Sequence, residues 1–274
     1  MKFRLSSFKK VLFAIGIMFV MIPQSIMAQS EKPKNLLLYD NQPYHFGFII
    51  GYNQMSYAIK FNEGYQLVPH SASEYPNTDT YASQDATYYV RSITPVPEPG
   101  FVVGVVGNLR LGKYFDLRLI PSLSFGSRTL EYQFYRELNG ETTNFSKKKS
   151  IFTTFVEFPL QVKYRSKRLN NIAAYVIAGG NFKIDLASQK KSQVDITGEQ
   201  GEIKTVTDNI RVKRTDLAAE VGAGFDFYTG HFKFGVEAKM SFGLFNILDS
   251  QNLIYDSSIK SIQNRTFQIS LTFE

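Results

Sequence analysis

Hydrophobic and polar residues alternate along residues 216–245, around a short turn at 228–231. Before the turn, one row of alternate residues is apolar, whereas the other contains glycines together with Glu220 and Asp226. After the turn, apolar residues alternate with residues such as Lys239. A period of two is typical of extended strands, because successive side chains leave opposite faces. Two such strands around a Gly-containing turn predict a β-hairpin.

The apolar rows of this hairpin are about ten residues long, which is what a tilted strand needs to cross a bilayer. In a soluble sandwich, an apolar row would face a core and the charged row would face water. In a membrane barrel, the apolar row faces lipid and the charged row faces the lumen. The hairpin fits both structures, so the rest of the chain has to decide between them.

The same alternation recurs along the chain. Together with the two strands of the hairpin, it predicts strands at 44–57, 100–111, 114–132, 151–165, 171–186 and 263–273. The connections after the second, fourth and sixth strands are short. The other connections are long and polar and lie at 60–99, 134–150, 187–214 and 249–260. The first of these is expected to be an irregular loop that can carry a short hairpin of its own.

Short turns at one rim and long loops at the other are typical of outer-membrane barrels. A soluble barrel of eight strands would instead pack the inner row as its core, and here that row consists of Gly, Ser, Asn and charged residues. The pattern therefore predicts an all-β membrane protein, an eight-stranded antiparallel up-and-down transmembrane β-barrel. The last strand ends in an aromatic residue, Phe273, just before the final Glu274, which resembles the C-terminal signal that the barrel-insertion machinery binds.

The first 28 residues have the features of a secretory signal peptide. Lys2, Arg4, Lys9 and Lys10 precede an apolar run at 11–22, and small Ala28 ends a plausible cleavage site. The alternative is an N-terminal membrane anchor, but the run is short and a polar, Pro-containing segment follows it. We therefore predict a signal peptide at 1–28, a periplasmic arm at 29–43 and a barrel domain at 44–274.

Composition adds to this interpretation. Removal of residues 1–28 leaves 27 basic residues against 24 acidic ones, which lowers the formal net charge from +7 to +3. No basic patch interleaved with aromatic residues remains, so the sequence gives no support for nucleic-acid binding. The chain has no Cys, 24 Phe and 16 Tyr. A secreted protein without disulfides can gain its stability from a closed, hydrogen-bonded barrel, and aromatic residues are favoured in strands and interfacial girdles.

The inner row supplies the candidate site. An eight-stranded barrel is just wide enough for its own side chains, and buried charges have to pair or lose their charge. We expect a lumenal charge network centred on Arg118, Glu157, Glu220 and Glu237, which closes the lumen; a proton or ion path is the alternative. The other residues of this set are Arg110, Asp116, Lys163, Lys183, Asp185, Asp226 and Lys239.

No catalytic motif stands out, so the sequence predicts no enzymatic activity, cofactor or metal site. His45, His70 and His231 are dispersed without metal-ligand spacing. The lysines at 147–149 and 190–191 are typical of solvated loop charge, with binding of lipopolysaccharide or a protein partner as the alternative.

Several ordered blocks resemble the PorT-like outer-membrane barrels of Bacteroidetes. The most specific are Asn108-Leu109-Arg110-Leu111, Glu157-Phe158-Pro159-Leu160 and Glu220-Val221-Gly222-Ala223-Gly224-Phe225-Asp226-Phe227-Tyr228. The resemblance covers about 44–273 and implies an outer-membrane location and a non-enzymatic role in type IX secretion and gliding motility. Its implied partners are outer-membrane lipids, other type IX components and the barrel-insertion machinery.

Two further functions stay open. A general surface barrel of the PorT-like group would bind a ligand, lipopolysaccharide or host molecule through its long loops, and the Tyr-, Ser- and Thr-rich stretch 65–94 favours this idea. A small transport channel is the third hypothesis. The sequence does not indicate the partner, the oligomeric state or the role of the loops at 60–99 and 187–214.

Overall fold

The computed structural model describes residues 34–71, 83, 85–187, 193–197, 203–207, 210–250 and 254–274. The predicted signal peptide and the lysines at 190–191 lie outside these residues. One compact unit comprises Asn35–Glu274. None of the described helices is long and apolar enough to cross a membrane.

Strands make up most of this unit, with two short 3₁₀ helices at Tyr39–Asn41 (η2) and Tyr65–Leu67 (η3). The strands are β1 (Tyr44–Phe61), β2 (Thr87–Arg110), β3 (Phe115–Leu119), β4 (Ser122–Leu138), β5 (Glu141–Arg165), β6 (Ile172–Asp185), β7 (Gln193–Thr197), β8 (Ile203–Thr207), β9 (Thr215–Tyr228), β10 (Lys233–Gly243) and β11 (Ile259–Phe273).

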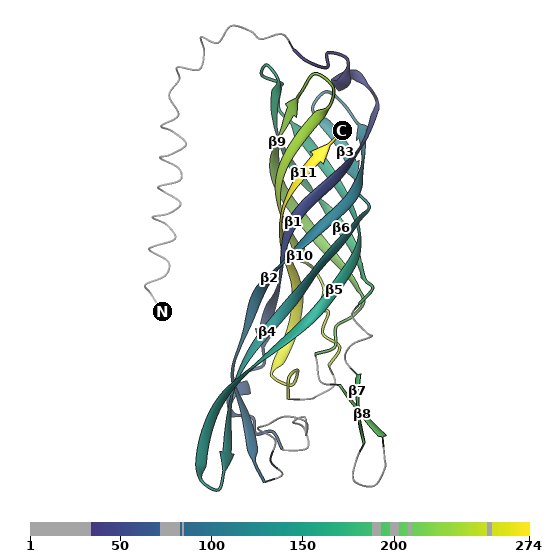
Figure 1. Cartoon of the computed structure of the whole chain (residues 1–274). Helices are drawn as coiled ribbons and strands as arrows, with labels where there is room; N and C mark the ends of the chain where they lie inside the picture. Colours follow the sequence, from purple (N-terminus) through teal and green to yellow (C-terminus); the bar gives the residue numbers. More distant parts are fainter. Residues whose placement is uncertain are drawn as a thin grey trace, which may run out of the picture. The chain divides into compact units, whose positions relative to one another are not determined.

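The main sheet closes into a ring. Its order is β1-β11-β10-β9-β6-β5-β3-β2-β4, and additional pairings join β1 to β2 and β5 to β4, all of them antiparallel. Strands β3 and β4 both lie between β2 and β5 and are separated only by Ile120 and Pro121, so together they form one wall strand. Proline has no N–H to donate to a ladder, which explains the interruption. The predicted eight-stranded antiparallel barrel is confirmed (Figure 1).

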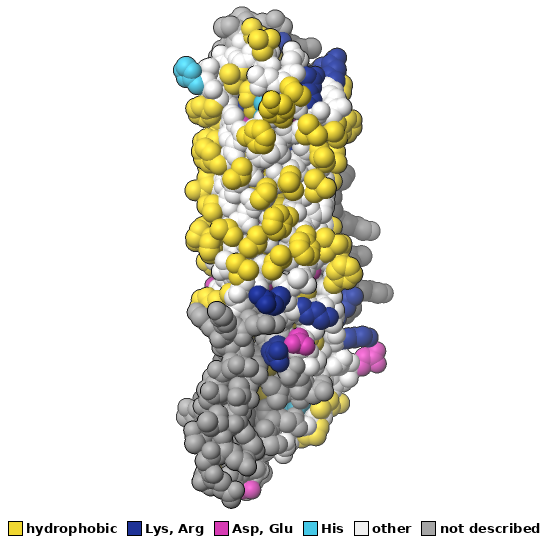
Figure 2. All heavy atoms as spheres, turned by 90° about the vertical axis from the view of Figure 1, so that its right-hand side faces the viewer, with side chains coloured by type: hydrophobic (Ala, Val, Ile, Leu, Met, Phe, Trp, Pro, Cys, Tyr) yellow, Lys and Arg dark blue, Asp and Glu magenta, His cyan; other side chains and the backbone are white. Residues whose placement is uncertain are grey.

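The two faces of the wall have the chemistry that the alternation predicts. Outward apolar side chains are exposed, among them Phe46 at 69% and Val105 at 58%, whereas Arg118 and Glu237 on the inner face are fully buried. Figure 2 shows the outward side chains as a broad hydrophobic belt across the face of the barrel in view. Such a belt would be unstable in water, so the surrounding medium has to be hydrocarbon.

The connections differ at the two ends of the barrel. At one end, which we call the short-turn end, the connections 111–114, 166–171 and 229–232 are short, and β11 finishes there. At the opposite, long-loop end, β2, β4 and β5 continue past the other strands (Figure 1). We call residues 87–96, 129–138 and 141–150 of these strands the extension.

The sequence-based expectation of a polar loop at 134–150 is wrong. Strands β4 and β5 stay paired up to Leu138 and Glu141, and Asn139 and Gly140 form the turn. Both turn residues have positive φ, at 52° and 82°, as a two-residue hairpin turn that matches the strand twist requires. Polarity was a poor guide here because one face of the extension contacts water.

The loop expected at 60–99 is also shorter than its composition suggests. Strand β2 already begins at Thr87, and its register with β4 includes Pro95 and Pro97. These prolines are tolerated because the pairing of β2 with β1 ends at Glu98, so at both prolines β4 is the one described strand that pairs with β2. Further along, Tyr88 of β2 forms an isolated bridge with His70. The predicted loop at 187–214 carries the β7–β8 hairpin.

The extension packs on an apolar core that it shares with β1, β11 and the loops at the long-loop end. On β4, the inward side chains Leu130, Tyr132 and Phe134 are buried, and the Tyr132 hydroxyl donates to the carbonyl oxygen of Tyr255 at 2.8 Å. Further residues of this cluster are Tyr57, Ala86, Tyr88, Val90, Ile93, Phe145, Ile151, Ile210, Val212, Ile247, Leu248, Ile254, Ile259 and Ile262. The strands beyond the belt therefore pack as a soluble domain does.

Candidate functional site in the barrel lumen

A single ion pair crosses the lumen between opposite walls. Strands β3 and β10 are separated by three wall strands in either direction around the ring. Arg118 on β3 reaches Glu237 on β10 at 2.6 Å, and both side chains are completely buried. The hydroxyl of Tyr175 donates to the same Glu237 carboxylate at 3.0 Å. Because the pair connects opposite strands, it occupies the middle of the lumen.

A second group follows the wall from β5 to β10. The Asn181 amide donates to Glu157 at 3.0 Å and to Glu220 at 2.8 Å, so it connects two carboxylates. Lys183 approaches Glu157 at 3.4 Å, and Lys239 approaches Glu220 at 3.1 Å. Each carboxylate thus has an ammonium partner, which offsets part of the cost of removing both from water.

The charges continue toward both ends of the lumen. On the side of the short-turn end, Lys163 pairs with Asp226 at 2.7 Å and lies over the Tyr175 ring, 3.7 Å from its centroid. On the side of the long-loop end, Arg128 pairs with Asp185 at 2.9 Å and lies 4.9 Å from the centroid of the Tyr57 ring. Arg128 therefore marks the boundary between the ionic lumen and the apolar core of the extension.

The structure brings nine of the eleven candidate residues into ion pairs. The exceptions are Arg110 and Asp116. Arg110 is half-buried near the short-turn end and donates to the carbonyl oxygen of Gly112. Asp116 is buried opposite Lys163 in the β3–β5 register, but Lys163 pairs with Asp226 instead.

Several ionic residues of the lumen were not among the eleven candidates. Arg128, Arg165 and Lys233 stand in the inward rows of their strands, so the period of two could have found them. Their partners include Asp40 before the first strand and Glu274 after the last one. No local pattern marks these two acids, because their positions depend on how the chain ends fold back. Within the described ranges, no group of three or more His, Cys, Asp or Glu residues could hold a metal ion.

The sequence matches a known protein family over residues 27–249, which is most of the chain. The family is described as the outer membrane protein beta-barrel domain. The chain belongs to this family of outer-membrane barrels. Its place is therefore the outer membrane, and the short-turn end of such a barrel faces the periplasm while its long loops face outward.

Three solved structures illustrate what the chain is similar to. The attachment invasion locus protein Ail of Yersinia pestis is 11% identical, with a TM-score of 0.32 over 85% of this chain and 98% of that one. Neisserial surface protein A is 8% identical, with a TM-score of 0.36 over 84% of this chain and 98% of that one. OprG of Pseudomonas aeruginosa is 11% identical, with a TM-score of 0.35 over 83% of this chain and 94% of that one. No curated protein sequence matches this chain.

The segment before β1 contacts the short-turn end of the barrel. Asp40 pairs with both Arg165 and Arg168, and the Tyr39 hydroxyl donates to Glu274 at 3.3 Å. Burial and the nearby Glu274 carboxylate raise the pKa of Tyr39 well above its usual range, so the hydroxyl stays protonated and can donate. These contacts tie residues 35–42 to the barrel rim.

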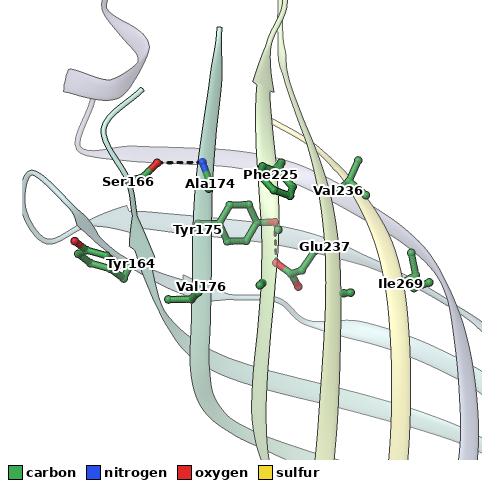
Figure 3. A pocket seen from close by; sticks show the side chains of 12 residues that line it. Tyr164, Ser166, Ala174, Tyr175, Val176, Phe225, Val236, Glu237 and Ile269 are labelled. Atoms are coloured by element: carbon green, nitrogen blue, oxygen red, sulfur yellow. Dashed lines mark hydrogen bonds between the residues drawn. The ribbon is translucent and has the colours of Figure 1, made fainter. Parts of the chain in front are cut away.

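An apolar depression of about 590 Å³ lies on the outer wall of the barrel. Ala223 and Ala238 face each other across β9 and β10 and are shorter than the flanking Val176 and Ile269. Figure 3 shows the hydrogen bond between the Tyr175 hydroxyl on β6 and the Glu237 carboxylate on β10, both of which line the same depression. The depression thus faces hydrocarbon, and its lining fits an acyl chain better than a polar ligand.

Proposed function

We propose that the protein is a non-enzymatic, non-conducting barrel that anchors its extension at the cell surface. The observation that carries this proposal is the Arg118–Glu237 pair, which crosses the lumen between opposite walls and is fully buried. An ion path would need a continuous hydrated passage at this level. Further ion pairs of Lys163, Lys183 and Lys239 also lie in the lumen, as expected where eight strands leave space only for side chains.

Planar-bilayer recording tests the sealed lumen. The purified mature protein, inserted in the bilayer, should give no conductance steps, whereas an open porin added as a positive control should. Replacing both central residues by small ones, as Arg118→Ser with Glu237→Ser, should produce brief openings if the pair blocks the lumen. Steady conductance steps from the unmodified protein would contradict the proposal.

Within this general role, we propose a component or assembly factor of the type IX protein secretion system. Its support is the ordered resemblance to PorT-like barrels, whose blocks include Arg110, Glu157 and Glu220. The last two belong to one hydrogen-bonded group through Asn181. Deletion of the gene should trap type IX cargo in the periplasm, and the wild-type gene should restore export. Normal export in the deletion strain would contradict this role.

A surface-binding function is the second candidate, and the packed core of the extension favours it. A buried apolar core holds the outward face rigid, and there Tyr89 and Tyr135 stack with ring centroids 4.6 Å apart. Such a face can bind a ligand without first being ordered.

Shortening the extension separates the two candidates. Gln133 and Ser146 face each other in the β4–β5 register, so residues 134–145 can be replaced by Asn-Gly to give a shorter hairpin. Surface binding predicts that the shortened protein still inserts and supports export but no longer binds cells or purified surface glycans. Loss of export with unchanged binding would instead favour a secretion role for the extension.

A further inference from the structure

Basic side chains gather at the long-loop end, directly beyond the hydrophobic belt. Three segments lie side by side there: the Lys213 N–H donates to the carbonyl of Ile247 at 2.8 Å, and the Ile247 N–H donates to that of Ile262 at 3.0 Å. The cations of these segments form what we call the basic cluster: Arg211, Lys213, Arg214, Lys260 and Arg265. Figure 2 shows dark blue side chains in this boundary zone, immediately next to the yellow belt.

The described part of the chain leaves most of the basic cluster without a carboxylate partner. Of the described residues, Asp249 pairs with Arg211 at 3.5 Å, and this ion pair is half-exposed on both sides. The Lys213 ammonium donates to a neutral acceptor, the carbonyl oxygen of Asn246, at 3.2 Å. Lys213, Arg214, Lys260 and Arg265 are exposed, and no carboxylate of the described chain lies within 4 Å of them. Among the described residues, the cluster thus carries a net positive charge.

The cluster also touches the apolar surface. Arg265 faces Phe242 in the β10–β11 register, and its guanidinium lies 5.8 Å from the centroid of that ring. Leu244 and Phe245, which follow directly after β10, are exposed at 51% and 60%. Apolar side chains at the edge of the belt are immersed in acyl chains, so the neighbouring cations stand at the depth of the lipid head groups.

We propose that the basic cluster binds the phosphate groups of a phosphorylated glycolipid in the outer leaflet. Lys213 and Lys260 flank Asn246, whose side-chain amide donates to the Lys260 carbonyl at 3.4 Å. Neighbouring strands are about 4.8 Å apart, so two ammonium groups on segments separated by one strand can reach the same head group. Leu244 and Phe245 would contact its acyl chains. The location in the outer membrane, rather than the role in secretion, is the basis of this proposal.

Binding of purified lipopolysaccharide to the full-length mature protein in detergent micelles tests the proposal. The variant with Lys213→Gln and Lys260→Gln should bind the phosphorylated glycolipid roughly 30-fold more weakly than the unmodified protein. The matched control carries Lys113→Gln and Lys167→Gln, which removes two exposed lysines from the short-turn end. This control should bind normally, and so should the charge-conserving variant with Lys213→Arg and Lys260→Arg.

The lipid series identifies what the cluster binds. Dephosphorylated lipopolysaccharide should bind as weakly as the glutamine variant, and an equal concentration of inorganic phosphate should not displace the glycolipid. Equal binding of the dephosphorylated lipid, equally tight binding of phosphatidylglycerol, displacement by free phosphate, or an equal loss in the control pair would each overturn the proposal. If the glutamine variant fails to fold, the salt dependence of glycolipid binding by the unmodified protein still tests the proposal. Added salt should weaken this binding, because salt screens contacts between cations and phosphate, and binding that salt does not weaken would overturn the proposal.

Discussion

The membrane part of the barrel and the extension are built from the same strands with opposite chemistry. On β4, the inward side chains in the membrane part include Ser122, Ser124 and Arg128, whereas those in the extension are Leu130, Tyr132 and Phe134. The outward side chains of β4 change from apolar in the membrane part, with Leu123 and Phe125, to polar in the extension, with Glu131 and Gln133. The strand keeps its direction and its period across this boundary, and only the residue types are exchanged.

This difference shows that the surroundings of a sheet decide which face is polar. Outside the membrane, the outward face contacts water, so folding is favoured when apolar side chains leave water for the inner side. Inside the membrane, the outward face contacts hydrocarbon, and burial of apolar side chains in the lumen would bring little further gain. Ionic residues can then fill the lumen, provided that each of them finds a partner.

The largest effect is expected from breaking the central ion pair in the membrane part. Glu237→Leu leaves the Arg118 guanidinium buried without its carboxylate, which should lower the free energy of unfolding by about 4 kcal/mol. Adding Arg118→Met should recover most of this loss, because an apolar pair needs no charge compensation. Denaturant-induced unfolding in detergent micelles measures the stability of the single and of the double variant. If Glu237→Leu alone were as stable as the wild type, the ion pair would not contribute to the stability of the barrel.

In the extension, a large-to-small substitution should lower stability through the loss of apolar packing. Leu130→Ala removes a fully buried side chain and should destabilise the extension by about 3 kcal/mol. Because the ionic lumen is untouched, the membrane part should keep its stability. Limited proteolysis should cut the extension of the variant much faster than that of the wild type, while the barrel core stays resistant. Equal cleavage rates would mean that the cluster is not a packed core.

The same new charge should have different effects on the outward faces of the two regions. Leu160 faces outward within the belt and is 49% exposed, so Leu160→Arg should cost about 2 kcal/mol in a bilayer. Gln133 faces outward in the extension, and Gln133→Arg should change stability very little because water surrounds it. The free energy of unfolding in vesicles measures both effects. Equal losses at positions 160 and 133 would mean that the two side chains face the same medium.

The smallest effect is expected at the tip of the extension. Gly140 has a φ of 82°, which a residue with a Cβ adopts with strain, so Gly140→Ala should cost about 1 kcal/mol. The effect should be confined to the β4–β5 hairpin, and amide hydrogen exchange near Leu138 and Glu141 measures it. Unchanged protection there would show that the turn does not limit the stability of the hairpin.

Alternation predicted the barrel because each inward or outward position follows from the period alone. It placed Arg118 and Glu237 in the lumen, but it could not show that they meet, since that contact depends on the order of the strands around the ring. The extension was missed because water-facing residues such as Gln133 and Asn144 resemble loop residues. The Asn139-Gly140 turn signal was present and would have revealed the hairpin.

The most direct test follows β4 across the boundary with labels that report the surrounding medium. The natural chain has no Cys, so Leu123→Cys and Gln133→Cys each provide a single attachment point for a spin label. In reconstituted vesicles, the label at 123 should collide mainly with oxygen dissolved in lipid, and the label at 133 mainly with a water-soluble nickel complex. Collision with the nickel complex at both positions would contradict the inversion of the two faces between the membrane part and the extension.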